Sequence, residues 1–357
     1  MKSILIIASL NNSANQERAI TNQLILQKNN FQVSILNDQK IFSHFFQLSF
    51  LSISPVNFIN YFFQNLIYKL HFRPYPLWSE MQLRGSIIKK IIQKNPPDIL
   101  ICQNPQDILC LIGLNPHIFT VYDSPTIFFQ ETKFENIYSQ SDIQKIKLAE
   151  KIIFKNAKLI SFHWQTFFDL AKNYHLSINN PVIANWSCPV TSSSLFSHQN
   201  NKIVHIGKLN SNWVNPQLLQ NLQNQSHLPI DIFSYEKPDF RYNSLQYKGF
   251  LKNIEKLSQY KFGLITISDN NLRNQGFSAK HLTYIAYGLP VFCPEWRQDK
   301  LLSSATIYYN ESNFNQLVKK YSNPLFWQKK HAAALKLKKH LTPENNLQQF
   351  IKALPYE

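Results

Sequence analysis

The sequence lacks paired cysteines, long hydrophobic runs and a signal peptide, and each absence excludes a class of protein. Its four cysteines show no C-x-x-C spacing, which argues against a disulfide framework or a zinc site and favours a reducing compartment. No apolar run approaches the roughly 20 residues of a membrane-spanning helix. The apolar start at 3–9 is shorter than a signal peptide needs. We therefore expect a cytoplasmic protein, either soluble or peripheral at the inner face of the cell membrane.

Glycine is also scarce, at 7 of the 357 residues, and most of it lies in the second half of the chain. The glycines of that half are Gly207, Gly249, Gly263, Gly276 and Gly288. Such positions indicate a positive φ or a close approach of the backbone to a ligand. Helix C-caps and tight turns are the alternative interpretation.

The charges are strongly unbalanced, with 37 Lys and Arg against 21 Asp and Glu, a formal net charge of +16. This excess favours an anionic partner, either a phosphate ligand, a nucleic acid or an anionic membrane face. With 44% hydrophobic and 16% charged residues, the composition is that of a globular chain. The length suffices for two domains with separate cores.

The hydrophobic pattern predicts an α/β fold. The apolar segment at 3–9 reads as a buried parallel strand, and residues 16–28 have helical spacing before another strand at 31–36. Further strands are predicted at 99–102, 118–123 and 158–162. This alternation is typical of a doubly wound sheet.

The pattern changes near residue 190. A stretch rich in Ser and Asn predicts a linker at 191–200, after which the strand-loop-helix order starts again. We therefore predict two Rossmann-like domains facing each other across a cleft. The first domain spans 1–190 and the second 201–325, and residues 326–357 form a helical segment that packs back onto the first domain.

The most informative segment runs from Asn274 to Phe292. It predicts a loop that leads through Ser278 and Ala279 into a helix, with Lys280 in the first turn and Gly288 at the end. A lysine at that place opposes the helix dipole, which favours an acid. The arrangement is explained if a diphosphate lies at the helix start and binds the ammonium together with backbone N–H groups.

This segment resembles the nucleotide-sugar signature of GT-B glycosyltransferases, a K-x-x-E-Y-x-A-x-G-x-P-V pattern. Other segments resemble that family in the same order, namely 183–186, 205–209 and 247–264. The resemblance implies a GT-B fold and a glycosyltransferase of polysaccharide biosynthesis. Such an enzyme moves a sugar from a nucleotide-diphosphate sugar to a glycan or lipid-linked acceptor.

The sequence departs from the family pattern in two places. Many retaining members have an E-x7-E pair, whose positions are taken here by Gln275 and Thr283. A carboxylate for the ribose is therefore absent, and only weaker hydrogen bonds remain available. The loop at 9–16 also lacks the paired glycines that often admit sugar phosphates. In keeping Lys280 without these features, the chain is nearer to xanthan-type glucuronosyltransferases.

The resemblance also suggests further donor-binding residues. Gly207 and Lys208 follow the first strand of the second domain. Arg273, on the loop before Lys280, would assist the leaving group, since two cations can replace a metal at a diphosphate. Glu295 either meets the ribose or sugar hydroxyls or is a solvated loop acid. No D-x-D motif is present, so we expect no metal and no cofactor besides the nucleotide-sugar donor.

Two residues are candidates for the catalytic base. Asp123 ends a predicted strand at the carboxyl edge, where doubly wound sheets bind their ligands. It either deprotonates the acceptor or caps the Asp-Ser-Pro turn through its own side chain. His163 is the second candidate, with a packed or hydrogen-bonded histidine as the alternative.

Other interpretations remain open from the sequence. The aromatic stretch at 41–78 either fills the core of the first domain or lies at an anionic bilayer and presents a lipid-linked acceptor. Lysines between 329 and 339 form either a membrane patch or a solvated helix face. A nucleic-acid-binding protein would fit the charge, yet no reader motif occurs. A catalytically inactive nucleotide-sugar-binding protein of the same fold is the other alternative, because the acidic pair is missing.

Overall fold

The computed structural model describes residues 1–8, 13–37, 41, 55–70, 74–103, 107–111, 114–174, 177–191, 201–209, 214–239, 245–267, 269, 272 and 278–356. The chain divides into two compact units. The first contains Met1–Asn185 and Asn346–Glu357, and the second contains Trp186–Asn345. Of the expected linker at 191–200, only Thr191 is among the described residues.

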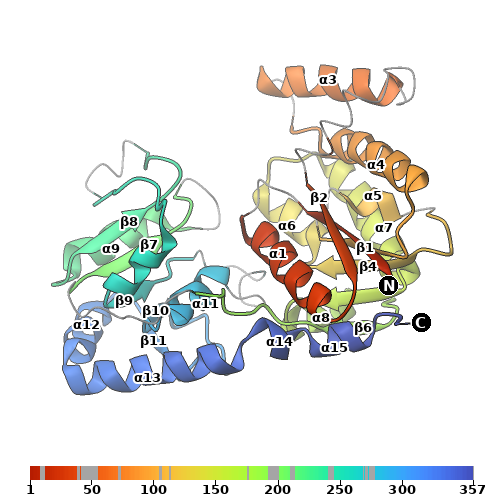
Figure 1. Cartoon of the computed structure of the whole chain (residues 1–357). Helices are drawn as coiled ribbons and strands as arrows, with labels where there is room; N and C mark the ends of the chain where they lie inside the picture. Colours follow the sequence, from red (N-terminus) through yellow and green to blue (C-terminus); the bar gives the residue numbers. More distant parts are fainter. Residues whose placement is uncertain are drawn as a thin grey trace. The chain divides into compact units, whose positions relative to one another are not determined.

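The first unit is a parallel six-stranded sheet in the order β2-β1-β3-β4-β5-β6. Its strands are β1 (Ser3–Ala8), β2 (Gln32–Asn37), β3 (Ile99–Cys102), β4 (Phe119–Ser124), β5 (Leu159–Phe162) and β6 (Pro181–Ile183). Its helices are α1 (Ser13–Lys28), α3 (Pro55–Lys69), α4 (Leu77–Lys94), α5 (Ile108–Leu111), α6 (Phe128–Glu135), α7 (Gln140–Asn156) and α8 (Gln165–Asn173) (Figure 1). All strands predicted for this half are confirmed, within one residue at each end.

Successive side chains of β1 point to opposite faces of the sheet, and each face is covered by its own core layer. Ile4 and Ile6 face one layer, whereas Ile7 faces the other. The first layer also contains Phe350 and Ile351 of α15 (Gln348–Lys352), close to the end of the chain. The predicted return of the C-terminal segment onto the first domain is thus confirmed for α15.

The second unit is a parallel five-stranded sheet in the order β11-β10-β9-β7-β8. Its strands are β7 (Ile203–Ile206), β8 (Ile230–Phe233), β9 (Phe262–Leu264), β10 (Val291–Pro294) and β11 (Thr306–Tyr309). Its helices are α9 (Pro216–Gln225), η3 (Ile254–Gln259), α11 (Ala279–Ala286), α12 (Phe314–Ser322), α13 (Pro324–His340) and α14 (Pro343–Asn346), the last reaching the unit boundary. The predicted α/β fold with two Rossmann-like domains is therefore confirmed.

The second sheet reverses its strand order at β7, because β8 lies on one side of it and β9 on the other. In open α/β sheets, ligands bind outside the carboxyl ends of the strands at such a switch point. The carboxyl end of β7 is therefore the place in this unit where a ligand is expected.

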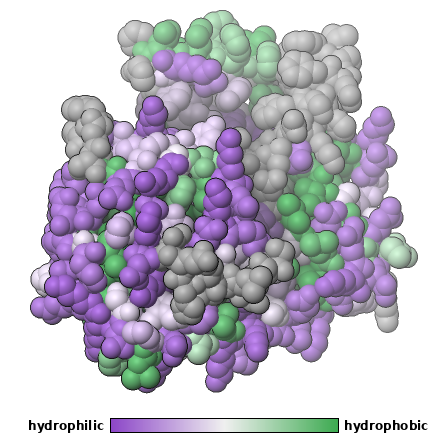
Figure 2. Space-filling model, turned by 60° about the vertical axis from the view of Figure 1, so that its left-hand side comes forward, coloured by the Kyte–Doolittle hydropathy of each residue, from purple (hydrophilic) through white to green (hydrophobic). Residues whose placement is uncertain are grey.

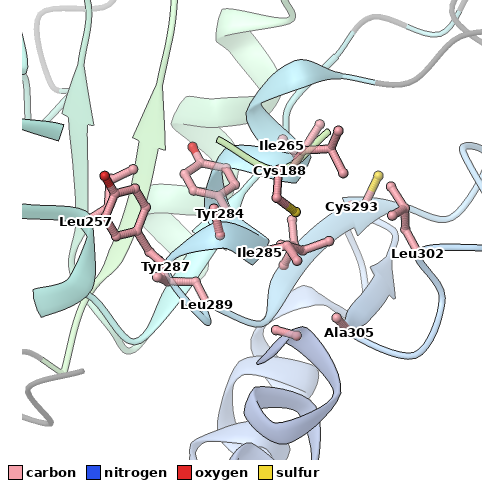
Figure 3. Close-up of a cluster of buried hydrophobic side chains, with 14 of the residues drawn as sticks. Cys188, Leu257, Ile265, Tyr284, Ile285, Tyr287, Leu289, Cys293, Leu302 and Ala305 are labelled. Carbon is pink, nitrogen blue, oxygen red and sulfur yellow. The ribbon is translucent and has the colours of Figure 1, made fainter. Parts of the chain in front are cut away.

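Helix α11 is fixed next to this edge by its apolar face. Figure 3 shows Tyr284 and Ile285 in a buried cluster with Cys293 of β10. At Gly263 of β9 an added Cβ would lie 2.4 Å from the Tyr284 ring, so the close approach of strand and helix requires glycine. Gly288, at φ +73°, follows the end of the helix as predicted.

The aromatic stretch at 41–78 divides between core and surface where the structure describes it. Phe58 and Tyr61 of α3 pack against the core, whereas Phe62 and Phe63 are exposed. The remaining phenylalanines of the stretch, Phe42, Phe45, Phe46, Phe50 and Phe72, lie outside the described residues. Within the described ranges, no helix is long and apolar enough to cross a bilayer.

Candidate functional site

The side chain of Lys280 lies directly over Gly207. Gly207 follows β7, and a Cβ built on it would lie 1.9 Å from the Lys280 Nζ and 2.3 Å from Cε. Its φ of +132° is itself a conformation that suits glycine. The first turn of α11 thus brings an ammonium group to the carboxyl end of β7, at the switch point of the sheet.

His205 lies close to this ammonium and is affected by its charge. His205 is buried on β7, and its Nδ1 lies 3.2 Å from the Leu264 carbonyl oxygen, to which it donates. Burial first, and then the charge of Lys280, lower its pKa to about 3. The imidazole is therefore neutral at physiological pH, and Lys280 supplies the positive charge here.

The hydroxyl group of Tyr284 ties the helix to the two strands beside this position. It accepts a hydrogen bond of 2.9 Å from the Ile206 N–H and donates one of 3.4 Å to the Leu264 carbonyl. Gly207 N–H donates to the Phe233 carbonyl of β8 at 2.9 Å. These bonds fix the β7 carboxyl end relative to Lys280.

The N-terminus of α11 adds backbone donors to the ammonium. Ser278 is the N-cap residue, and its hydroxyl makes no capping hydrogen bond. The first N–H groups of an α-helix have no partner within the helix. Together with the helix dipole, they form an anion-binding environment. The elements of the predicted phosphate site are thus adjacent in the second unit.

A small pocket lies beside the same helix start, lined by Ser278 and His281 of the helix region and by Arg297 after β10. Arg297 is buried, and burial lowers its pKa, an effect opposed by Asp299, whose carboxylate lies 3.9 Å from it. A second cation therefore borders the helix start, and the sequence reasoning did not identify it.

In the first unit, Asp123 is the centre of a buried polar cluster. Arg18 of α1 binds its two carboxylate oxygens, through Nε at 2.8 Å and Nη2 at 2.9 Å. Gln103 donates to it at 2.9 Å, and the His163 Nε2 lies 3.0 Å from Oδ1. Arg18 also donates to the Ala184 carbonyl at 3.0 Å. The cluster thus joins α1 to the carboxyl ends of β3, β4 and β5.

The protonation states in this cluster follow from burial and charge. Burial alone would raise the pKa of the Asp123 carboxyl, but the guanidinium of Arg18 holds it well below its ordinary value. Burial and the same guanidinium lower the pKa of His163 to about 4. At neutral pH the cluster is therefore an ion pair of Arg18 and Asp123, with a neutral His163 that donates through Nε2.

The similarity of this chain to known proteins lies in its fold. No protein-family model matches the chain, and no curated protein matches it in sequence. Solved structures are similar to it in fold, and three of them illustrate the range. HepE from Anabaena, solved in complex with UDP-glucose, is 12% identical with a TM-score of 0.63, over 99% of this chain and 100% of that one.

A sucrose-phosphate synthase from Thermosynechococcus elongatus is 8% identical with a TM-score of 0.64, over 99% of this chain and 98% of that one. TarM is 11% identical with a TM-score of 0.53 over 76% of this chain, which spans only 58% of the TarM chain. The chain has the GT-B fold. At these identities the likeness concerns the fold alone.

Within this GT-B fold, the other predicted donor-binding residues do not take part in the contact between Lys280 and Gly207. Thr283 is half-buried, and its hydroxyl donates to the Ala279 carbonyl of its own helix at 3.2 Å. Lys208 is exposed beside Gly207. Glu295 is exposed after β10 and accepts hydrogen bonds of 3.0 and 3.1 Å from the Asn310 amide. Arg273 and Gln275 lie outside the described residues.

Asp123 and His163 are brought together in this GT-B fold, yet both are 0% exposed. Asp123 does not cap its own turn, because its oxygens bind Arg18, Gln103 and His163. Within that turn, the Ser124 hydroxyl donates to the Thr126 carbonyl at 2.7 Å. The role of catalytic base stays a prediction for both residues. The sequence reasoning missed Arg18, since nothing in a polar helix marks which cation turns inward.

Proposed function

We propose that the protein is a glycosyltransferase that takes a sugar from a nucleotide-diphosphate sugar held at Lys280. The observation that carries this proposal is the contact of the Lys280 ammonium with Gly207, at the start of α11 and the switch point of the second sheet. A side chain at position 207 would clash with Lys280, so the glycine allows the ammonium to lie at the carboxyl end of β7, where a ligand is expected.

The chemistry of this position suits a diphosphate. When the bond between the sugar and the diphosphate breaks, negative charge develops on the leaving phosphate. A fixed ammonium and helix N–H groups stabilise that charge without reorganisation. His205 is neutral at physiological pH, so it does not compete with Lys280 as a charged proton donor to the phosphate. Among the described residues, no cluster of His, Cys, Asp or Glu gathers to hold a metal. We propose that cations, Lys280 first, act in place of a metal.

The donor and acceptor are proposed by chemical class. HepE, which shares the fold, was solved with UDP-glucose, and this supports a UDP-hexose as the first donor to test. For the acceptor we propose a glycan or a lipid-linked sugar in polysaccharide assembly, reached from the inner face of the cell membrane.

A second candidate function is a nucleotide-sugar-binding protein without turnover. The burial of Asp123 and His163, both 0% exposed, favours it. So does Thr283, which replaces an acidic residue and donates to its own helix. Binding of a nucleotide sugar with neither hydrolysis nor transfer would support this alternative.

The experiment is a turnover assay with a panel of nucleotide sugars. We expect release of the nucleoside diphosphate by the wild-type chain and its loss in Lys280→Ala. Lys336→Ala, which removes an exposed lysine of α13, is the matched control and should keep full activity. Equal activity of the wild-type and Lys280→Ala chains would contradict the proposed role of Lys280.

A further inference from the structure

Helix α3 carries an apolar face that is exposed. Ile59, Phe62, Phe63, Leu66 and Leu70, the last just after the helix, are 52, 58, 58, 45 and 56% exposed. At 3.6 residues per turn they fall within an arc of roughly 100°. Figure 2 shows the hydrophobic side chains gathered over α3 at the top of the view. Single exposed apolar residues are ordinary, but a contiguous apolar stripe marks an interaction surface.

The opposite side of α3 is anchored to the first unit. Phe58 and Tyr61 pack against the core layer beneath α4. Gln64 accepts a hydrogen bond of 2.9 Å from the Ser79 hydroxyl of α4, and the rings of Tyr68 and Tyr75 meet edge to face at 5.1 Å. Because these contacts fix the rotation of the helix, the apolar stripe lies on the exposed side of α3. Figure 1 shows α3 beyond α4, at the edge of the first unit.

Helix α3 contains no acidic residue, and its one cation is Lys69. In the sequence, no acidic residue occurs between Asp38 and Glu80; of the three cations in that interval, Lys40, Lys69 and Arg73, only Lys69 is among the described residues. Lys69 is exposed in the last turn of α3, at the edge of the stripe. The whole chain carries +16. The charge complement of this surface is therefore anionic.

We propose that the outer face of α3 is a docking surface for an anionic lipid bilayer. An amphipathic helix with an aromatic and aliphatic face and a cation at the edge of that face lies in the plane of the interface, with its apolar side about 5–10 Å into the headgroup region. A second copy of the chain would bring the same positive charges against this face, which disfavours a dimer there. Anionic headgroups match both the apolar stripe and the lysine.

The proposed function includes an acceptor reached from the membrane, and α3 would provide the contact with that membrane. The docking proposal rests on the proposed function only for the identity of the acceptor. A lipid-linked acceptor would lie in the bilayer to which α3 docks. Docking itself depends on α3 and not on Lys280, so the two proposals can fail separately. Donor binding, measured without vesicles, should be the same in the wild-type chain and in every α3 variant.

The test is co-sedimentation of the full chain with vesicles of phosphatidylcholine, with or without phosphatidylglycerol. We expect clear binding only to the anionic vesicles. The double variant Phe62→Ser/Phe63→Ser should lower the partition coefficient at least about tenfold. Lys69→Gln should lower it about fivefold on anionic vesicles and leave neutral vesicles unaffected.

The matched control is Leu148→Ser/Ile152→Ser on α7, which removes exposed aliphatic side chains of the same unit, 60 and 36% exposed. It should bind vesicles as the wild-type chain does, and thermal melts should show all variants folded. Equal binding of the α3 double variant, or no binding of the wild type to anionic vesicles, would overturn the proposal. A wild-type dimer in light scattering that the double variant loses would also overturn it, because a second copy would then cover this face.

Discussion

The ammonium of Lys280 occupies the space that a side chain at Gly207 would need, with 1.9 Å between Nζ and a Cβ built on the glycine. The two residues come from α11 and from the end of β7, far apart in the sequence. Their contact places a positive charge at the switch point of the second sheet. Donor binding should therefore depend on both residues together.

A methyl group at position 207 should displace Lys280 and weaken donor binding. We expect Gly207→Ala to weaken UDP binding at least about tenfold, since a charged contact of this kind is worth about 1.5–3 kcal/mol. In a Lys280→Ala background the same substitution should cost less affinity, because the clash is gone and only the strain of an alanine at φ +132° remains. A double-mutant cycle by titration calorimetry measures this coupling. Additive effects would show that the two residues act independently.

Removal of Arg18 should destabilise the first unit. Arg18→Met would leave the Asp123 carboxylate buried without its cation, which typically costs about 3–5 kcal/mol. The combined variant Arg18→Met/Asp123→Asn should recover part of that loss, because no uncompensated charge remains. Urea denaturation of the three chains, followed by circular dichroism, provides the comparison. If Arg18→Met were as stable as the wild type, the ion pair would contribute little to the free energy of unfolding.

Asp123→Asn should bind the donor normally and transfer the sugar poorly. Donor binding is assigned to the second unit, whereas the carboxylate holds His163 through a 3.0 Å contact in the first. The amide would change which imidazole nitrogen carries the proton. Steady-state kinetics with saturating donor separates the two effects. Full activity of this variant would mean that another residue is the catalytic base, and His163→Gln would be the next variant to assay.

Stability should fall as the pH drops from about 6.5 towards 3, because His281, like His163 and His205, is buried in its neutral form. Burial, and secondarily the charge of Arg297, lower its folded-state pKa to about 3. In this window the unfolded chain binds a proton that the folded chain does not, so acidification favours unfolding. His281→Gln should make the melting temperature less dependent on pH in the same window. An unchanged pH dependence would mean that other groups dominate.

Much of the fold could be predicted from the sequence because several strands are short, mostly apolar runs. Ile99–Cys102 and Leu159–Phe162 are buried at every position, and such runs are recognisable without tertiary information. The helix that carries Lys280 was also predictable, since Gly288 marks its end and Leu282 and Ile285 form an apolar face. Both signals are local.

The buried polar cluster could not be predicted, for a physical reason. Arg18 and Asp123 are 105 positions apart, and only the pairing of β1 with β3 and of β3 with β4 brings them together. The same limit applies to α3. Its aromatic residues lie on both sides of the helix, and only the packing of Phe58 and Tyr61 shows that Phe62 faces outward. Which member of a residue class turns inward is decided by tertiary contacts.

Titration calorimetry of UDP against the wild-type, Lys280→Ala and Lys336→Ala chains tests the proposed site most directly. We expect Lys280→Ala to weaken binding by about 1.5–3 kcal/mol, the range for a hydrogen bond to a charged group, and Lys336→Ala to bind as the wild type does. Equal affinity of the wild-type and Lys280→Ala chains would contradict a diphosphate site at the start of α11.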